Sequence, residues 1–117
     1  MHQRTPKKLS SFELHKMITA NSEGIVIIDV REEQELKLAS LKLPFLHLPL
    51  SQASIWSKNY HEKIPHNKSI VVVCHAGIRS WSFGQWLIDQ GWLEDIWNLE
   101  GGIDAWSVDI DETIPRY

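Results

Sequence analysis

Cys74 is the residue of this sequence with the clearest chemical potential. It is the one cysteine in the chain, so it can form neither an internal disulfide nor, by itself, a thiolate metal site. The apolar run 69–73 leads directly into it, and a short loop follows. Two interpretations are open. Cys74 is either a small hydrophobic residue that ends a core strand or a reactive thiol.

The loop from His75 to Ser80 favours the reactive thiol. In an open α/β sheet, ligands bind beyond the carboxyl ends of strands, which is where Cys74 stands. If the loop curls around the sulfur, its backbone N–H groups and the start of the next helix, expected about six residues after Cys74, would stabilise a thiolate. Gly77 suits a close turn, Arg79 supplies a fixed positive charge for an anionic substrate, and Ser80 adds a hydroxyl.

The segments around this loop are those of an α/β domain on a mostly parallel sheet. The β-branched runs 25–29 and 69–74 are typical of strands buried on both faces, and 96–99 is a shorter strand. Leucines alternate around Pro49, which indicates an edge strand or a strand end. Four helical patterns are expected around the strands. The first starts at Ser10 or Ser11 and has Phe12, Leu14, Met17 and Ile18 on one face. The others start at Glu32, extend from Ser51 to Tyr60, and run through Phe83, Trp86 and Leu87 to a stop at Gly91.

Length and charge restrict the possible functions. The 117 residues suit one domain, and 43% hydrophobic with 23% charged residues is an ordinary globular composition. Twelve basic and fifteen acidic residues give a net charge of −3, so nucleic acid is not an expected partner. No apolar run approaches a membrane span and the first residues lack a secretory signal, which predicts a cytoplasmic protein without a membrane partner, expected to be a monomer.

Three segments stand in the order found in the rhodanese family. The stretch from Cys74 to Arg79 resembles its active-site loop, in which a cysteine, four residues and an arginine enclose a sulfur-sized cradle. IIDVRE (27–32) is similar to the family's Asp-Val-Arg segment, and LEGGIDAW (99–106) to its closing Gly-Gly-x-x-x-Trp segment. The segment 39–44 departs from the usual family pattern and keeps only a proline.

This resemblance implies one rhodanese-like domain over residues 1–117, with a core at about 9–106 and a tail at 107–117. It implies a five-stranded, mainly parallel sheet flanked by helices on both faces. The implied activity is sulfur transfer without a metal or organic cofactor. Cys74 takes the sulfane sulfur of a small anion such as thiosulfate, carries it as a persulfide, and passes it to an unknown thiol or protein acceptor. The expected anion-binding loop consists of His75, Ala76, Gly77, Ile78, Arg79 and Ser80.

Two other functions stay open. Cell-cycle phosphatases of the same fold have one more loop residue than the four between Cys74 and Arg79, so the shorter loop favours sulfur over phosphate or arsenate chemistry. A non-catalytic module could instead carry or sense sulfur, or dock a partner through a tryptophan-rich surface.

Several further residues have expected roles. Asp29 and Arg31 are expected to form a buried ion pair that supports neighbouring loops. His75 is expected to serve in loop packing or donor contact, since an ionised thiol needs no base, and the other histidines lack metal-ligand spacing. Trp81 is expected to pack against a neighbouring helix, with a position over the pocket mouth as the alternative. Glu32, Glu33 and Glu35 are expected on a solvated helix face, and Trp92, Trp97 and Trp106 in or beside the core.

Overall fold

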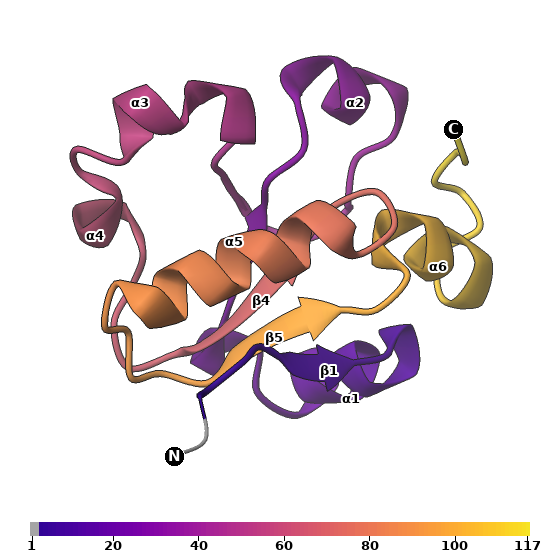
Figure 1. Ribbon diagram of the computed structural model, residues 1–117. Helices are drawn as coiled ribbons and strands as arrows, with labels where there is room; N and C mark the ends of the chain where they lie inside the picture. The colour runs from indigo at the N-terminus through magenta and orange to yellow at the C-terminus, as the bar shows by residue number, and fades with distance from the viewer. Residues whose placement is uncertain (1–2) are drawn as a thin grey trace.

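The centre of the molecule is a sheet of five parallel strands, described by a computed structural model that covers residues 3–117 (Figure 1). The strand order is β1-β5-β4-β2-β3, and every neighbouring pair runs in parallel. The predicted α/β class with a mainly parallel five-stranded sheet is therefore confirmed. The strands are β1 (Lys7–Leu9), β2 (Ile25–Asp29), β3 (Leu46–His47), β4 (Ser69–Val73) and β5 (Ile96–Leu99).

β4 is the central strand, with β2 and β5 on its two sides. Because successive side chains of a strand point to opposite faces, Ile70 and Val72 enter one core, and Val71 and Val73 enter the other. All four side chains are fully buried. Burial on both faces is the reason that this strand appears in the sequence as a continuous apolar run.

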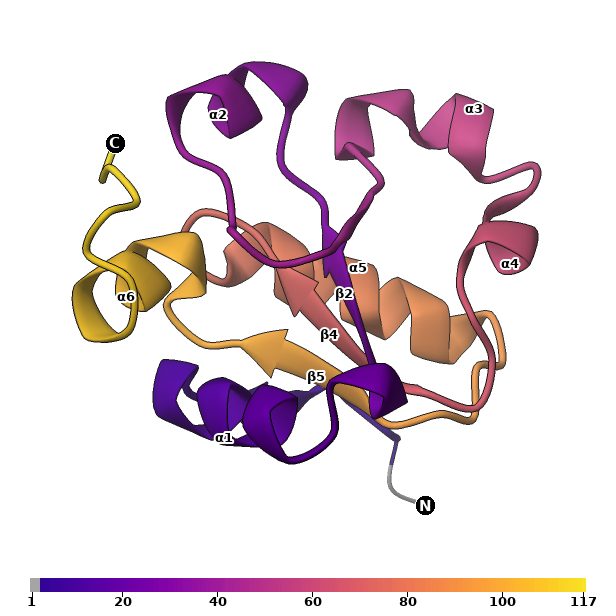
Figure 2. The ribbon, with the colours of Figure 1, turned by 180° about the vertical axis from the view of Figure 1, so that it is seen from behind.

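Helices cover both faces of the sheet, as predicted (Figures 1 and 2). On one face, Phe83 and Leu87 of α5 pack with Trp56 of α3. On the other face, Leu14 of α1 packs with Trp106 of α6. The helices are α1 (Ser11–Asn21), α2 (Glu33–Leu38), α3 (Ala53–Trp56), α4 (Tyr60–Lys63), α5 (Ile78–Asp89) and α6 (Gly102–Asp109), with 3₁₀ turns at η1 (Ser22–Gly24) and η2 (Leu50–Gln52).

The start of α1 confirms one prediction and corrects another. The helix begins at Ser11, as predicted, and Ser10 and Glu13 form a capping box, in which each side chain accepts a hydrogen bond from the other residue's N–H. Phe12, however, is 58% exposed, whereas Leu14 is fully buried. Residues two positions apart lie on opposite sides of a helix, so Phe12 and Leu14 cannot both face the sheet. The prediction that Phe12 belongs to the buried face was wrong.

The ends of α5 are set by two glycines. Gly77, at a φ of 105°, is the N-cap residue, so the helix begins at Ile78 rather than about six residues after Cys74. Gly91, at a φ of 97°, follows the C-cap residue Gln90, as predicted.

The segment from Ser51 to Tyr60 is not the single helix that was predicted. The N–H groups of Lys58 and Asn59 bond to carbonyls three residues back, at Ile55 and Trp56, and this tighter turn ends α3 before α4 begins. The predicted edge strand is confirmed as β3, which ends before Pro49.

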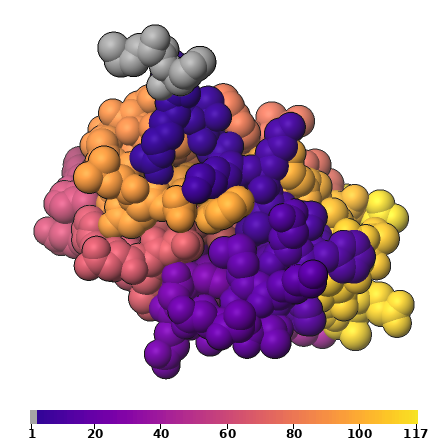
Figure 3. Space-filling view, turned by 90° about the horizontal axis from the view of Figure 1, so that it is seen from below, coloured from indigo at the N-terminus to yellow at the C-terminus, as the bar shows by residue number. Residues whose placement is uncertain are grey.

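The N-terminal segment forms an edge strand that the sequence did not predict. Lys7 pairs with Trp97 in the register of β1 and β5, and its ammonium lies 2.9 Å from a carboxylate oxygen of Asp95. Arg4 donates a 2.6 Å hydrogen bond to the carbonyl of Trp92. Figure 3 shows this indigo segment lying across the orange part of the chain. Throughout residues 3–117, the helices fall short of the length and apolar character that crossing a bilayer requires.

Candidate active site around Cys74

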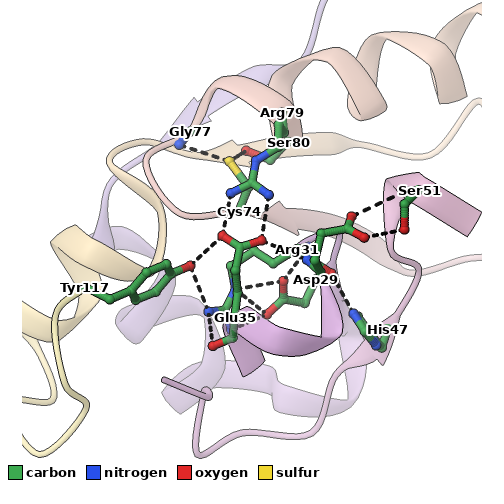
Figure 4. A network of polar contacts seen from close by, with 11 residues as sticks. Asp29, Arg31, Glu35, His47, Ser51, Cys74, Gly77, Arg79, Ser80 and Tyr117 are labelled. Atoms are coloured by element: carbon green, nitrogen blue, oxygen red, sulfur yellow. Dashed lines mark hydrogen bonds and ion pairs between the residues drawn. The ribbon is translucent and has the colours of Figure 1, made fainter. Parts of the chain in front are cut away.

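Cys74 follows β4 directly, at the carboxyl end of the central strand, as predicted. Its side chain is 1% exposed and belongs to the core under α5. The Gly77 N–H donates to Sγ at 3.1 Å, and Ser80 Oγ lies 3.2 Å from the same atom (Figure 4). Both groups can stabilise negative charge on the sulfur. Over residues 3–117, Gly77 is the one loop residue whose backbone N–H bonds Sγ, so the expected ring of converging N–H groups is reduced to one donor.

A buried side chain from β5 supports the Cys74 loop, by which we mean residues 74–80. Ser80 Oγ donates a short hydrogen bond to Asn98 Oδ1, and Asn98 Nδ2 donates to the carbonyl of Gly77 and to Glu100 Oε2, both at 3.0 Å. Asn98 was not predicted as a site residue from the sequence. The available signal was a polar residue inside the apolar strand 96–99, because a buried polar side chain needs partners.

The N-terminus of α6 holds the other side of the loop. The N–H of Ile103 donates to the carbonyl of Cys74 at 2.9 Å, and the N–H of Asp104 donates to that of His75 at 3.1 Å. Gly102, at a φ of 58°, permits this approach, because a Cβ there would lie 2.4 Å from both carbonyl oxygens. The turn at Gly101 and Gly102 therefore brings α6 against the backbone of Cys74 and His75.

Arg79, the fixed positive charge of the loop, is paired with Glu35 of α2. Its two terminal nitrogens reach the two carboxylate oxygens at 2.7 and 2.8 Å (Figure 4). Arg79 is the main reason that the pKa of Glu35 falls from 4.5 to about 2, and Glu35 in turn raises the pKa of Arg79. The expectation of a solvated position was wrong for Glu35, whose side chain is 17% exposed. It is confirmed for Glu33, which is exposed. The partners are 44 residues apart, and no local pattern indicates their contact.

Asp29 and Arg31 form the predicted buried ion pair. Both side chains are fully buried, and the guanidinium donates to both carboxylate oxygens at 2.9 to 3.2 Å. Burial lowers the pKa of Arg31, but its bonds to Asp29 and Tyr117 outweigh this effect and raise it. The ring of His47 bonds the Arg31 carbonyl at 2.6 Å. The pair closes a turn at the end of β2, and the Val30 N–H within this turn donates to the carbonyl of Val73, the residue before Cys74, at 3.0 Å.

Tyr117 reaches this network from the C-terminal segment, which was predicted only to be a tail. Its hydroxyl donates to Glu35 Oε1 at 2.9 Å and accepts from Arg31 Nη1 at 3.1 Å. Its ring stacks on that of His75, with the centroids 4.1 Å apart. Burial is the main cause that raises the pKa of Tyr117, so the hydroxyl remains protonated and able to donate. Ile114, buried in the core beside α6, anchors the segment.

The tryptophans divide between core and surface. Trp92 and Trp106 are buried and Trp97 is partly buried, as predicted. Trp81 is 41% exposed on the first turn of α5, more than expected of a residue that mainly packs against a neighbouring helix. Within residues 3–117, no three or more His, Cys, Asp and Glu side chains are grouped so that they could hold a metal ion.

The family comparison agrees with this geometry. A family model described as rhodanese-like domain matches residues 11–109. The chain belongs to the rhodanese-like domain family. The matched range includes the Cys74 loop and the carboxylates that surround it, and ends before the segment that carries Tyr117.

Individual relatives cover this chain to different extents. It is 38% identical over 91 residues to the rhodanese-like/PpiC domain-containing protein 12, chloroplastic, of Arabidopsis thaliana, a match that covers 78% of this chain but 30% of that protein. It is 31% identical over 100 residues to the thiosulfate sulfurtransferase GlpE of Coxiella burnetii, with 86% of each covered. The crystal structure of a rhodanese-like domain protein from Staphylococcus aureus matches with a TM-score of 0.71 and 25% identity, over 95% of this chain and 98% of that one.

Proposed function

We propose that this chain is a sulfurtransferase that carries sulfur as a persulfide of Cys74. The observation that carries the proposal is the placement of Sγ at the end of β4, within 3.2 Å of both the Gly77 N–H and the Ser80 hydroxyl. Membership of the family and similarity to a thiosulfate sulfurtransferase support sulfur transfer at the family level. A small sulfur donor such as thiosulfate and the cytoplasm as the compartment are part of the proposal.

In the first half-reaction, the Cys74 thiolate attacks the sulfane sulfur of thiosulfate. An S–S bond forms to Sγ, the bond to the sulfonate sulfur breaks, and its electron pair leaves with sulfite. One thiolate and one dianion give Cys74–S–S⁻ and a sulfite dianion, so atoms and charge balance. The Gly77 N–H and the loop held by α6 are in place before the reaction, which reduces the reorganisation needed to stabilise the new anion.

In the second half-reaction, a nucleophile attacks the outer sulfur and releases the Cys74 thiolate. With cyanide, Cys74–S–S⁻ and CN⁻ give the thiolate and thiocyanate. A thiol of a small molecule or a protein is the proposed natural acceptor.

Intact-protein mass spectrometry tests the proposal. Brief treatment with thiosulfate should add about 32 Da, one sulfur atom, and cyanide should then remove it. Cys74→Ser should gain no mass, and sulfite, which lacks the sulfane sulfur, is the matched reagent control.

Two results would overturn the proposal. One is an adduct that persists in Cys74→Ser. The other is no adduct with thiosulfate or a thiosulfonate, combined with turnover of an aryl phosphate or arsenate, which would support the phosphatase or reductase alternative.

A further inference from the structure

Arg79, the one arginine of the Cys74 loop, forms a two-bond ion pair with Glu35. Arg79 donates to both oxygens of Glu35, and each oxygen has a second donor. Tyr117 donates to Oε1 at 2.9 Å, and the backbone N–H of Glu32 donates to Oε2 at 2.8 Å. Rotation of the carboxylate away from Arg79 would therefore break two further hydrogen bonds. Tyr117 is itself held by Arg31, whose side chain is fixed by the buried Asp29.

The other charges near the loop also oppose a strongly anionic ligand. Glu100 accepts a hydrogen bond from Asn98, and over residues 3–117 it has no cationic partner. Glu100 is therefore a negative charge beside the loop without an ion-pair partner in the described part of the chain. The arginines near the loop are each paired with a carboxylate: Arg31 with Asp29, Arg79 with Glu35, and Arg116 with Asp104.

We propose that Glu35 and Tyr117 determine the charge selectivity of this site: they hold and neutralise Arg79, so that sulfur donors of low negative charge are preferred over dianions. This inference rests on the proposed sulfur transfer. Glu35 acts on the donor through Arg79, and Tyr117 acts through Glu35, so both are positioning residues. A dianion gains little from an arginine whose charge is already compensated, and it is repelled by the remaining carboxylate.

Two donors that differ by one charge test the selectivity. Thiosulfate is a dianion and releases sulfite, whereas methanethiosulfonate is a monoanion and releases methanesulfinate. Both give the same persulfide. In Glu35→Gln, the ratio of kcat/KM for thiosulfate to that for methanethiosulfonate, with cyanide as acceptor at low ionic strength, should rise about fivefold, as expected for one charge removed from a partly solvated site. Glutamine can still accept the Glu32 N–H bond, so the α2 capping box is retained.

Glu33→Gln is the matched control. It removes the same charge from the same helix at an exposed position. This variant should leave the ratio unchanged. Tyr117→Phe keeps the ring on His75 and removes only the hydroxyl, and it should shift the ratio in the same direction as Glu35→Gln by about twofold, because one of two supporting bonds is lost.

Alkylation of Cys74 provides a measurement that does not depend on sulfur transfer. The rate with iodoacetate, an anion, relative to that with neutral iodoacetamide should rise in Glu35→Gln and not in Glu33→Gln. Equal ratios in wild type and Glu35→Gln, for donors and for alkylating reagents, would overturn the inference. An unchanged ratio in Tyr117→Phe would overturn the part assigned to Tyr117. A shift in the alkylation ratio without sulfur transfer from either donor would overturn the proposed function instead.

Discussion

The hydroxyl hydrogen of Ser80 has two possible acceptors, which are Asn98 Oδ1 and Cys74 Sγ. Asn98 presents Oδ1 to Ser80, because its Nδ2 is committed to Gly77 and Glu100, so the Ser80 hydroxyl donates to Asn98. The Cys74 thiol can then donate to Ser80 Oγ. When the thiol ionises, the hydroxyl hydrogen can turn toward Sγ, which becomes the stronger acceptor. Ser80 is thus positioned to support both protonation states of Cys74.

The substitution Ser80→Ala should therefore slow the alkylation of Cys74 without abolishing it. A hydrogen bond to a charged group contributes about 1.5 kcal/mol, so alkylation of Ser80→Ala by iodoacetamide at pH 7 should be about tenfold slower. Ser82→Ala, an exposed serine on the same helix, is the control and should react at the wild-type rate. Urea unfolding of both variants separates the loss of reactivity from loss of folding. An unchanged rate in Ser80→Ala would show that the hydroxyl does not support the thiolate.

At the scale of elements, the site depends on the contact between the Cys74 loop and α6. The first N–H groups of α6 satisfy the carbonyls of Cys74 and His75, and the same bonds fix the direction in which the loop leaves β4. The helix can approach so closely because Gly102 has no side chain. The Gly-Gly pair is thus part of the site although neither glycine contacts Sγ.

Gly102→Ala should destabilise the protein by about 3 kcal/mol, because the new Cβ meets two backbone oxygens and the positive φ adds strain. Gly91→Ala is the matched control. It has a positive φ but open space around the position, so it should cost about 1 kcal/mol. Urea unfolding gives both values. Persulfide formation should fall in Gly102→Ala and remain in Gly91→Ala, and equal stability of the two variants would contradict the steric argument.

Elements with a strong local signal were predicted, and those formed by distant contacts were not. β2 and β4 are buried on both faces, so their apolar runs were enough to identify them. β1 has three residues, two of them lysines, and is a strand because of its register with β5. The Cys74 loop was predicted because its residues directly follow the apolar run of β4 in the sequence. Glu35 and Tyr117 were not identified as site residues, because their partners lie 44 and 82 residues away.

On the scale of the whole molecule, one network of charges and hydrogen bonds joins four parts of the chain at the carboxyl edge of the sheet. It runs from Asp29 at the end of β2 and the nearby Arg31 through Tyr117 of the C-terminal segment to Glu35 of α2 and Arg79 of α5 (Figure 4). Because these parts are distant in sequence, the network forms only in the folded state. Its ionisation is therefore linked to the free energy of unfolding of the whole domain.

Glu35 gives this linkage a defined pH range. Its pKa is lowered from 4.5 in the unfolded chain to about 2 in the folded protein, first by Arg79. The ionised carboxylate therefore stabilises the fold fully above about pH 4.5, and this contribution is lost as the pH falls toward 2. The Arg79 side chain is 37% exposed, so solvent screening should keep the contribution below about 2 kcal/mol.

Urea unfolding of wild type and Glu35→Gln between pH 3 and pH 7 measures this contribution. The difference in their free energies of unfolding should be constant from pH 7 to about 5.5 and should shrink steadily below pH 4.5, because a protonated Glu35 resembles glutamine. Glu33→Gln carries the same change of charge at an exposed position and should follow the wild-type curve. A difference between wild type and Glu35→Gln that stays constant down to pH 3 would mean that Arg79 does not hold Glu35 ionised, and the neutralisation of the loop arginine would then lose its physical basis.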